Sequence, residues 1–357
     1  MTQENKYKLL RLLQQHKSLG ISNQIDFDKF YLYSIITHST AIEGSTVTEV
    51  EAQLLFDEGI TSNKRTMQEQ QMNLDLKVAY EYGREWIKQH APITVDWLIL
   101  LASKVIARTG SEYSAMGGKF SAAKGELRKL NVTAGLGGKS YMSFQKVPAR
   151  LAAFCEELNK RRKAIDPTDM AAVYDLSFWA HFELVTIHPW ADGNGRTCRL
   201  LMNLLQWEFD VLPTKVLKED KAEYIQALID TRESDDISIF LDCMARHHCR
   251  HLQNDIDQFV KSTTEEHSAN VLEKNEVKTG QLSKRQEKIL KLFVETGKLN
   301  VLENVLENVV ETSTSLGAKL GVDARTVRRD LAVMQTLGYI RHSGPDKGGC
   351  WQILKTL

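Results

Sequence analysis

The sequence predicts a mainly α-helical protein that carries one β-hairpin and ends in a small α+β domain. Three observations support this fold class. Apolar residues recur at helical spacing through most of the chain, as they do within residues 200–205. A glycine-rich stretch at 134–138 lies between β-prone residues, which is typical of a hairpin. A second glycine-rich tip, at 344–349, divides the β-prone residues of 339–353.

The composition is that of an ordinary globular protein. Of the 357 residues, 42% are hydrophobic and 26% are charged. Lysine plus arginine and aspartate plus glutamate number 46 each, so the net charge favours neither a nucleic-acid coat nor a membrane surface. We find no apolar signal segment and no run long enough to span a bilayer, and therefore expect a cytoplasmic protein without membrane contact. The five scattered cysteines favour reduced thiols.

Amphipathic helices are predicted throughout the first third of the chain. Residues 1–20 form a polar start with one apolar side. The pattern that begins at Asp26 predicts a helix that ends at Gly44, because glycine is favoured just after a helix end. Residues 48–110 show helical periodicity with a break at Pro92. The candidate core residues of this stretch are Trp86, Trp97, Leu98, Leu100 and Leu101.

The hairpin is predicted within residues 130–144. Val132 precedes the glycine tip and Tyr141 follows it, and both are β-prone residues. A plain surface loop is the alternative for this stretch. Two further amphipathic segments follow at 147–162 and at 170–210, and the second of these is a pair of helices.

The helix pair is interrupted at residues 188–199, His-Pro-Trp-Ala-Asp-Gly-Asn-Gly-Arg-Thr-Cys-Arg, by residue types that suit a phosphate-binding site. The proline after His188 disfavours the helical conformation, so the upstream helix should end there, and the next should start at Arg196. Helix N-termini attract anions. Gly193 and Gly195 allow the backbone to approach phosphate oxygens closely.

The side chains of this stretch have complementary chemistry. Arg196 and Arg199 lie three apart on one helical face, where their guanidinium groups could clamp phosphates. Asp192 suits Mg²⁺, which usually binds through one or two carboxylates and the phosphates of a substrate. His188 is the natural general base, because its unperturbed pKa lies near neutrality. The alternative is a glycine loop between two core helices.

These residues resemble the signature of the Fic family, His-Pro-Phe-x-[Asp/Glu]-Gly-Asn-Gly-Arg-x-x-Arg. Every polar position matches. Trp190 replaces the usual phenylalanine, and we expect it to alter packing behind the histidine while leaving the chemistry intact. The resemblance implies a Fic-type helical bundle with a β-hairpin flap over the active site. It also implies transfer of AMP from ATP, with Mg²⁺, to a Ser, Thr or Tyr hydroxyl of a target protein, which could be the chain itself.

The resemblance implies a role for each residue. His188 would take the proton of the attacking hydroxyl, and Asp192 would hold Mg²⁺. Within 221–228, Tyr224 would contact the adenine. The implied nucleotide-binding residues are Gly193, Asn194, Gly195, Arg196, Thr197, Arg199 and Tyr224. Removal of AMP at the same site and a different nucleotide donor are the alternatives within the family.

A second resemblance concerns the helix that ends at Gly44. Ser39 and Glu43 lie four residues apart on one helical face. Residues 39–44 are similar to the inhibitory segment of many Fic proteins, [Ser/Thr]-x-x-x-Glu-[Gly/Asn]. In that family the glutamate pairs with the second arginine of the motif, here Arg199, and keeps the γ-phosphate of ATP from seating productively. The alternative is an exposed helix glutamate before a capping glycine.

The last quarter of the chain resembles a bacterial winged helix-turn-helix of the DeoR type. Helices are predicted at 282–296 and 315–322, a third begins after an N-cap at Asp323, and 339–353 forms the wing. The residues predicted to face outward and contact DNA are Arg325, Thr326, Arg328 and Arg329. Protein docking or homodimerisation is the alternative, because residues 312–357 hold only seven basic residues against three acidic ones.

The predicted domains are N-terminal helices at 1–110, a Fic catalytic core at 111–260, a polar linker at 261–285 and a winged helix at 286–357. A non-enzymatic alternative is a transcription factor whose Fic part senses nucleotide or modifies itself. The near-copies of four residues within 300–311 have a period far below that of a solenoid unit, and we have no functional account of them.

One histidine cluster is a candidate metal site. Cys243, His247 and His251 recur every four residues on a predicted helix, so one face could present three ligands to zinc. The sequence offers no fourth ligand, and we therefore interpret the cluster as part of a helix end.

Overall fold

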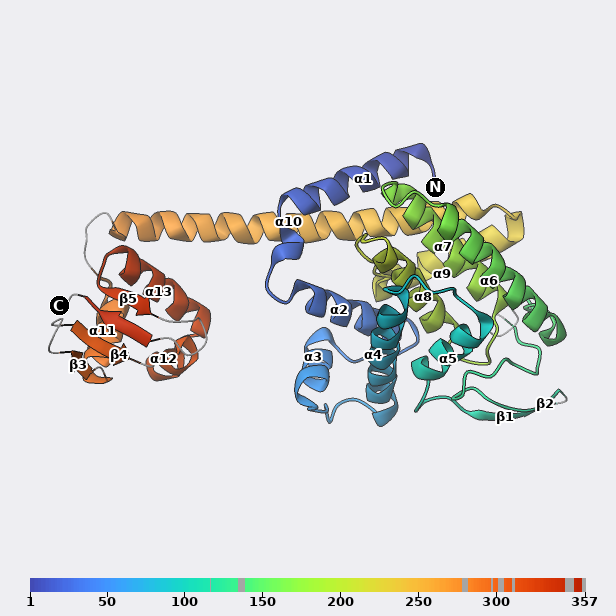
Figure 1. Cartoon of the computed structure of the whole chain (residues 1–357), viewed down its shortest axis with the longest axis horizontal. Helices are drawn as coiled ribbons and strands as arrows, with labels where there is room; N and C mark the ends of the chain where they lie inside the picture. Colours follow the sequence, from blue (N-terminus) through green and yellow to red (C-terminus); the bar gives the residue numbers. More distant parts are fainter. Residues whose placement is uncertain are drawn as a thin grey trace. The chain divides into compact units, whose positions relative to one another are not determined.

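The computed structural model describes residues 1–115, 117–133, 139–277, 282–296, 298–300, 305–309, 312–343 and 350–354. The chain divides into two compact units, Met1–Phe259 and Val260–Leu357. The described residues are mostly helical, with a few short strands (Figure 1). The predicted mainly α fold class is confirmed.

The first unit is a bundle of helices. Its longer helices are α1 (Gln3–Ser18), α2 (Phe27–Ile42), α3 (Glu49–Glu58), α4 (Met67–Ile87), α5 (Val95–Val105), α6 (Val147–Ala164), α7 (Met170–Ile187), α8 (Asn194–Glu208), α9 (Lys221–Ser234) and α10 (Ile237–Val277). Single 3₁₀ turns lie at Ile21–Asn23, Phe144–Lys146 and Lys218–Asp220.

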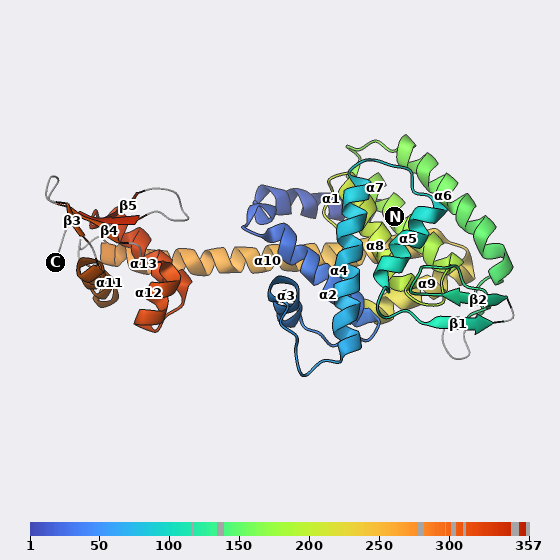
Figure 2. The same cartoon turned by 60° about the horizontal axis from the view of Figure 1, so that its bottom comes forward.

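Helix α8 lies at the centre of this unit, packed against α7 and α4 (Figure 2). The four leucines of its predicted apolar face, at positions 200, 201, 204 and 205, are fully buried. Gly83 of α4 permits the close approach of α4 and α8, because a Cβ there would lie 2.5 Å from the Leu204 side chain. The closely packed, buried α7–α8 pair therefore supports the loop between the two helices.

The helices that surround this pair begin at the residues that favour helix starts. Thr48 and Thr66 each accept a hydrogen bond from the backbone three residues on, and Glu51 and Glu69 bond back to complete two capping boxes. Four of the five predicted core residues at positions 86–101 are buried or half-buried. Leu100 is 46% exposed, because it lies on the opposite side of α5 from the residues that face the core.

The first unit carries one two-stranded antiparallel sheet, β1 (Glu112–Ala115) with β2 (Gly118–Ser121). These two strands were not predicted from the sequence. In the hairpin that it did predict, Thr133 and Ser140 form an antiparallel bridge, and Tyr141 N donates to Val132 O at 3.0 Å. The glycine tip at 134–138 lies outside the described residues.

The second unit combines helices with a four-stranded antiparallel sheet of order β3-β4-β6-β5. Its elements are α11 (Lys284–Thr296), β3 (Lys298–Asn300), β4 (Val305–Val309), α12 (Ser313–Leu320), α13 (Ala324–Thr336), β5 (Ile340–Ser343) and β6 (Cys350–Ile353). Strands β3 and β4 fall within the near-repeats of 300–311 and the residues just before them, where the sequence had suggested no element. The predicted wing tip at 344–349 lies outside the described residues.

Helix α13 begins where the sequence predicted. Asp323 accepts hydrogen bonds of 2.9 Å from the backbone N–H groups of Arg325 and Thr326, and the Thr326 hydroxyl also donates to Asp323. Arg325, Arg328 and Arg329 are exposed, whereas the hydroxyl of Thr326 is engaged with Asp323 in the helix cap. A DNA contact by these four residues stays a prediction, as does the winged-helix assignment.

The segment predicted as an irregular linker is helical over most of its length. Helix α10 continues to Val277, through the first 17 residues of the predicted linker 261–285. The reason lies in the sequence, which has neither glycine nor proline between Ile237 and Val277. No helix among the described residues, α10 included, has both the length and the apolar character needed to cross a bilayer.

Candidate active site

The site begins where α7 ends. Its last residue is Ile187, and His188 adopts a left-handed conformation (φ 51°, ψ 63°) with its backbone N–H bonded to Leu184 O. Proline at position 189 disfavours further helix. The predicted helix end at His188 is therefore confirmed, and the turn directs the chain into the glycine loop.

Trp190 and Asn194 hold this loop in shape. Trp190 is fully buried, and its indole N–H donates to Gly125 O at 2.9 Å. Asn194 Oδ1 accepts from Trp190 N at 3.1 Å, and Asn194 Nδ2 donates to Trp190 O at 2.8 Å. The side-chain amide of Asn194 therefore shapes the loop, and its contact with phosphate stays a prediction.

The N-terminus of α8 faces the loop. Helix α8 begins at Asn194, two residues earlier than the sequence predicted, after Gly193 in a left-handed conformation (φ 79°). Gly193 thus has the conformation that glycine alone adopts without cost. The backbone N–H groups of the first turn, at Asn194, Gly195 and Arg196, have no acceptor within the helix. Such a helix N-terminus suits an anion, and binding of phosphate here stays a prediction.

Arg196 brings a buried positive charge to this end of α8. The residue is 3% exposed, and its Nη2 lies 3.3 Å from Asp192 Oδ1. Among the described residues, neither Nε nor Nη1 of Arg196 has a hydrogen-bond partner. Buried donors without partners are costly. A phosphate between Arg196 and the helix N-terminus would satisfy them.

Asp192 is suited to a magnesium ion that arrives with a nucleotide. Its side chain is 51% exposed, and its Oδ1 accepts from Gly193 N at 2.5 Å. Within the described chain, no three His, Cys, Asp or Glu side chains are grouped as a metal site. Mg²⁺ commonly binds through one carboxylate, phosphate oxygens and water, so a single open carboxylate beside a phosphate site fits this ion.

The predicted contact between α2 and Arg199 is present. Arg199 Nη2 lies 2.5 Å from Glu43 Oε1, and Arg199 also donates from Nε to Ser39 Oγ and from Nη2 to Ser39 O, both at 2.9 Å. The Arg199 side chain is 3% exposed and that of Glu43 is 34% exposed. Ser39 and Glu43 together occupy the guanidinium of Arg199.

The Glu43 carboxylate also covers the start of α8. A Cβ built on Gly195 would lie only 2.5 Å from Glu43 Oε1, so the carboxylate rests directly against this glycine. The carboxylate therefore occupies the space beside the helix N-terminus and Arg199. An anion of a nucleotide would need the same space and would be repelled by the negative charge.

Glu43 and Arg199 each stabilise the charged form of the other. Burial raises the pKa of Glu43, but the charge of Arg199 and its hydrogen bond outweigh burial and hold the Glu43 pKa below its ordinary value. Burial would lower the pKa of Arg199, and Glu43 reverses this effect, so the guanidinium stays protonated. Both groups are therefore ionised near neutral pH.

An aromatic side chain stacks on His188. The ring of Tyr141 stacks on its imidazole, with the ring centroids 3.9 Å apart and the planes inclined by 22°. Burial, together with the positive charges of Arg128 and Arg232, lowers the pKa of His188 to about 4, although the Val185 backbone and Glu43 act in the opposite direction. The imidazole is therefore neutral at physiological pH, as a general base must be.

Arg128 is a site residue that the sequence analysis missed. It is 1% exposed, and its guanidinium donates to three backbone carbonyls: His188 O at 2.7 Å, Leu130 O at 2.8 Å and Met142 O at 2.6 Å. Its backbone N–H also donates to Pro189 O at 2.9 Å. One arginine thus joins the histidine loop to both ends of the predicted hairpin. Its position in a charged surface-like stretch gave no signal of this role.

Two further predicted nucleotide residues lie in the core. Tyr224 is 1% exposed, and its hydroxyl lies 2.9 Å from His181 Nε2. Arg199 influences the Tyr224 pKa, which burial raises to about 12, so the two side chains are close. Thr197 is fully buried in α8. Tyr224 packs beside Arg199 in the core, and its contact with adenine stays a prediction.

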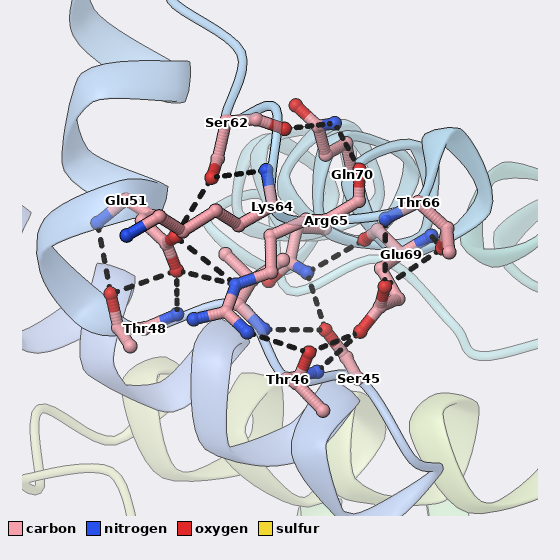
Figure 3. A network of polar contacts seen from close by, with 12 residues as sticks. Ser45, Thr46, Thr48, Glu51, Ser62, Lys64, Arg65, Thr66, Glu69 and Gln70 are labelled. Atoms are coloured by element: carbon pink, nitrogen blue, oxygen red, sulfur yellow. Dashed lines mark hydrogen bonds and ion pairs between the residues drawn. The ribbon is translucent and has the colours of Figure 1, made fainter.

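The segment after Glu43 is fixed to α3 and α4 by a polar network (Figure 3). Glu69 accepts from Thr46 N at 2.7 Å and Thr46 Oγ1 at 2.6 Å, as well as from its own cap residue. Arg65 donates to Thr46 Oγ1 at 3.0 Å. Buried Asn73 of α4 bonds Ser45 Oγ at 3.2 Å. These contacts hold the end of α2, and with it Glu43, in place.

The histidine cluster of α10 is engaged in pairs. His247 Nε2 lies 2.8 Å from Glu223 Oε2, and His251 Nε2 lies 2.6 Å from Asp220 Oδ2. Cys243 Sγ lies 3.7 Å from His247 Nε2. These contacts attach α10 to α9 and to the turn before it.

The fold and site together define a helical protein in which a histidine, a glycine loop, a helix N-terminus and two arginines lie together where α7 gives way to α8. Residues 92–206 match the model of the Fic/DOC family. The chain is 27% identical over 266 residues to protein adenylyltransferase fic-1 of Caenorhabditis briggsae, covering 73% of this chain and 47% of that protein. It is 25% identical over 229 residues to protein adenylyltransferase Fic of Drosophila melanogaster, covering 62% and 41%. Together these matches support a Fic family protein.

Solved structures share the fold. A Fic domain protein of Bacteroides thetaiotaomicron has a TM-score of 0.58 at 21% identity and covers 71% of this chain and 97% of its own. A Fic family protein of Desulfovibrio desulfuricans has a TM-score of 0.58 at 18% identity and covers 99% of this chain and 97% of its own. The alignments with the two curated relatives span less than half of each relative's length.

Proposed function

We propose that this chain is an autoinhibited protein adenylyltransferase, which transfers AMP from ATP to a hydroxyl of a protein and can include itself among its targets. The observation that carries the proposal is the Glu43 carboxylate, bound to Arg199 and resting on Gly195 at a helix N-terminus that otherwise suits phosphate. The matched relatives are named protein adenylyltransferases, which supports the reaction type.

In the proposed reaction, the acceptor hydroxyl attacks the α-phosphorus of ATP. A bond forms between the hydroxyl oxygen and this phosphorus, the bond to the bridging oxygen breaks, and pyrophosphate leaves. The neutral imidazole of His188 takes the hydroxyl proton, as its lowered pKa permits. Arg128 holds the backbone of His188 in the required turn.

The remaining residues bind the polyphosphate. Arg196 has open donors for phosphate oxygens, and the first turn of α8 adds backbone N–H groups. Arg199 would bind the γ-phosphate once Glu43 has left it. Asp192 would hold Mg²⁺, which when bound neutralises charge on the phosphates of the leaving group.

The proposal is tested by incubating the protein with Mg²⁺ and ATP labelled in its α-phosphate, alone and with a cell lysate. Wild type, Glu43→Gly and His188→Asn are compared. We expect strong protein-bound label with Glu43→Gly, little with wild type and almost none with His188→Asn. Absence of label from all three, across several nucleotides, would contradict the proposal and favour AMP removal or nucleotide sensing.

The pKa of His188 gives a prediction on pH dependence. Because its pKa in the folded protein is about 4, the imidazole loses its proton well below the ordinary value of 6.5. Activity should therefore stay nearly constant between about pH 6 and 8, where an ordinary histidine would titrate. The measurement is an NMR titration of the free protein, with the His188 signal assigned by its loss in His188→Asn. A titration midpoint near pH 6.5 would show that water reaches the imidazole and that its pKa is not lowered.

The polar network gives a prediction on regulation. Glu69→Gln weakens the bonds to Thr46 and should loosen the end of α2, which lowers the occupancy of Glu43 at Arg199. A loss of ~1 kcal/mol corresponds to about fivefold higher transfer activity. The assay is the rate of label incorporation, with Glu85→Gln as control because Glu85 lies on the same helix and is exposed, in an ion pair with the nearby Lys88. Equal rates for Glu69→Gln and wild type would refute this link.

A further inference from the structure

We infer that Tyr141 is a positioning residue of the transfer reaction, holding the imidazole of His188 in one orientation for proton transfer. The inference rests on the proposed function. It depends on three observations: the stack between the two rings, the contacts that fix Tyr141 from α9, and a closed chain of bonds through Arg128.

The stack fixes the orientation of the general base. A centroid distance of 3.9 Å leaves no room for another group between the rings, and an inclination of 22° keeps them nearly parallel. Tyr141 therefore covers one face of the imidazole. The nitrogen atoms, which lie in the plane of the ring, are not covered by this stacking. The stacking therefore restricts rotation of the imidazole but leaves its nitrogen atoms uncovered for proton transfer.

Helix α9 holds Tyr141 from the other side. The guanidinium carbon of Arg232 lies 5.2 Å from the centroid of the Tyr141 ring, within cation–π range. Arg232 is itself oriented, because its Nε donates to Leu228 O at 3.0 Å. Lys139, two residues before Tyr141, forms a 2.8 Å ion pair with Glu233. This pair is exposed and contributes little energy, but it places the segment on α9.

Backbone hydrogen bonds also connect Tyr141 to His188, by way of Arg128. Tyr141 N donates to Val132 O, and the next carbonyl, Met142 O, accepts from Arg128 at 2.6 Å. The same guanidinium donates to His188 O at 2.7 Å. A continuous path therefore runs from the Tyr141 backbone through Arg128 to the His188 backbone, and back through the two stacked rings. Arg128 thus fixes the backbone at His188 and next to Tyr141, from which the two stacked rings project.

The charged groups that face His188 come from three elements. Arg128 lies after β2, Arg232 lies on α9, and Glu43 lies at the end of α2. Removing the Tyr141 ring would admit water to the imidazole and leave these charges in place. The expected consequences are a misoriented base and an imidazole that is more easily protonated.

The inference is tested in the active Glu43→Gly protein by comparing Tyr141→Phe with Tyr141→Leu. Phenylalanine keeps the stacked ring, so we expect kcat within about twofold of the parent. Leucine removes it, and we expect kcat to fall about tenfold while the KM for ATP changes less than twofold. Tyr113→Leu is the matched control, because Tyr113 also stacks on a ring, that of Phe120, but in the β1–β2 hairpin. Thermal melting of each variant checks folding.

An NMR titration of His188 provides a readout that does not depend on activity. In Tyr141→Leu the His188 midpoint should move up toward the ordinary value, and in Tyr141→Phe it should not move. Equal kcat and an unchanged midpoint in folded Tyr141→Leu would overturn the inference, as would failure of Tyr141→Phe to retain activity. If the Glu43→Gly parent shows no transfer, the proposed function fails, and the titration still decides whether Tyr141 controls the environment of His188.

Discussion

We expect the replacement of Glu43 by glycine to raise the proposed rate of AMP transfer by about 10- to 100-fold. The substitution removes a carboxylate that is bound to Arg199 and lies against Gly195. A hydrogen bond between ionised groups contributes about 1.5–3 kcal/mol, and its loss frees Arg199 for the γ-phosphate. The fraction of protein competent to bind ATP productively then rises by the corresponding factor. The measurement is the initial rate of label incorporation from α-labelled ATP.

Two variants control this result. Glu58→Gly is matched, because Glu58 also ends a helix before a left-handed glycine, Gly59, but its side chain is exposed, whereas Arg199 is bonded by Ser39 and Glu43. It should leave the rate unchanged. Glu43→Gln keeps the shape of the side chain without its charge, and should give an intermediate rate because it no longer repels a phosphate. A rate for Glu43→Gly equal to that of wild type would refute the inhibitory role of α2.

Replacing His188 in the Glu43→Gly protein lowers the rate by about 10²- to 10⁴-fold, the usual contribution of a general base. Asparagine is the better substitution, because it tolerates the left-handed conformation of this position more readily than alanine does. The loss should appear in kcat, with ATP binding little changed, because the proposed phosphate contacts come from α8 and its arginines. Pre-steady-state label incorporation and ATP titration separate the two quantities.

His90→Asn is the matched control for this prediction. His90 is the other histidine with a positive φ among the described residues (50°), and it lies on the surface beside Glu208. Its replacement imposes the same backbone demand and should not change the rate. Retention of more than about a tenth of the activity in His188→Asn would show that another group accepts the proton.

The central helices and the loop between them could be predicted from the sequence because their signals are local. Proline at position 189 ends α7, and four leucines at helical spacing define the buried face of α8. The pairing of Glu43 with Arg199 spans 156 positions in sequence. No local pattern predicts it, and only the resemblance of two short motifs to one family brought it into view.

The parts of the site that could not be predicted depend on tertiary contacts. Arg128 looks like a surface arginine until the fold brings three carbonyls around it. Asn194 matches a motif position, but its amide is used within the loop. Tyr141 was identified only as a β-prone residue, since nothing in the sequence places its ring on His188. A side chain's neighbours, unlike its own helix or turn, require the assembled fold.

The most direct test of the central claim compares two labels in one protein. Glu43→Gly is incubated with Mg²⁺ and ATP carrying the label in the α-phosphate, and in parallel with ATP carrying it in the γ-phosphate. Transfer of AMP predicts that the α-label becomes bound to protein while the γ-label is released as pyrophosphate. Protein-bound γ-label would contradict the account, because it would show transfer of the terminal phosphate, and binding of neither label would show that the site does not transfer AMP.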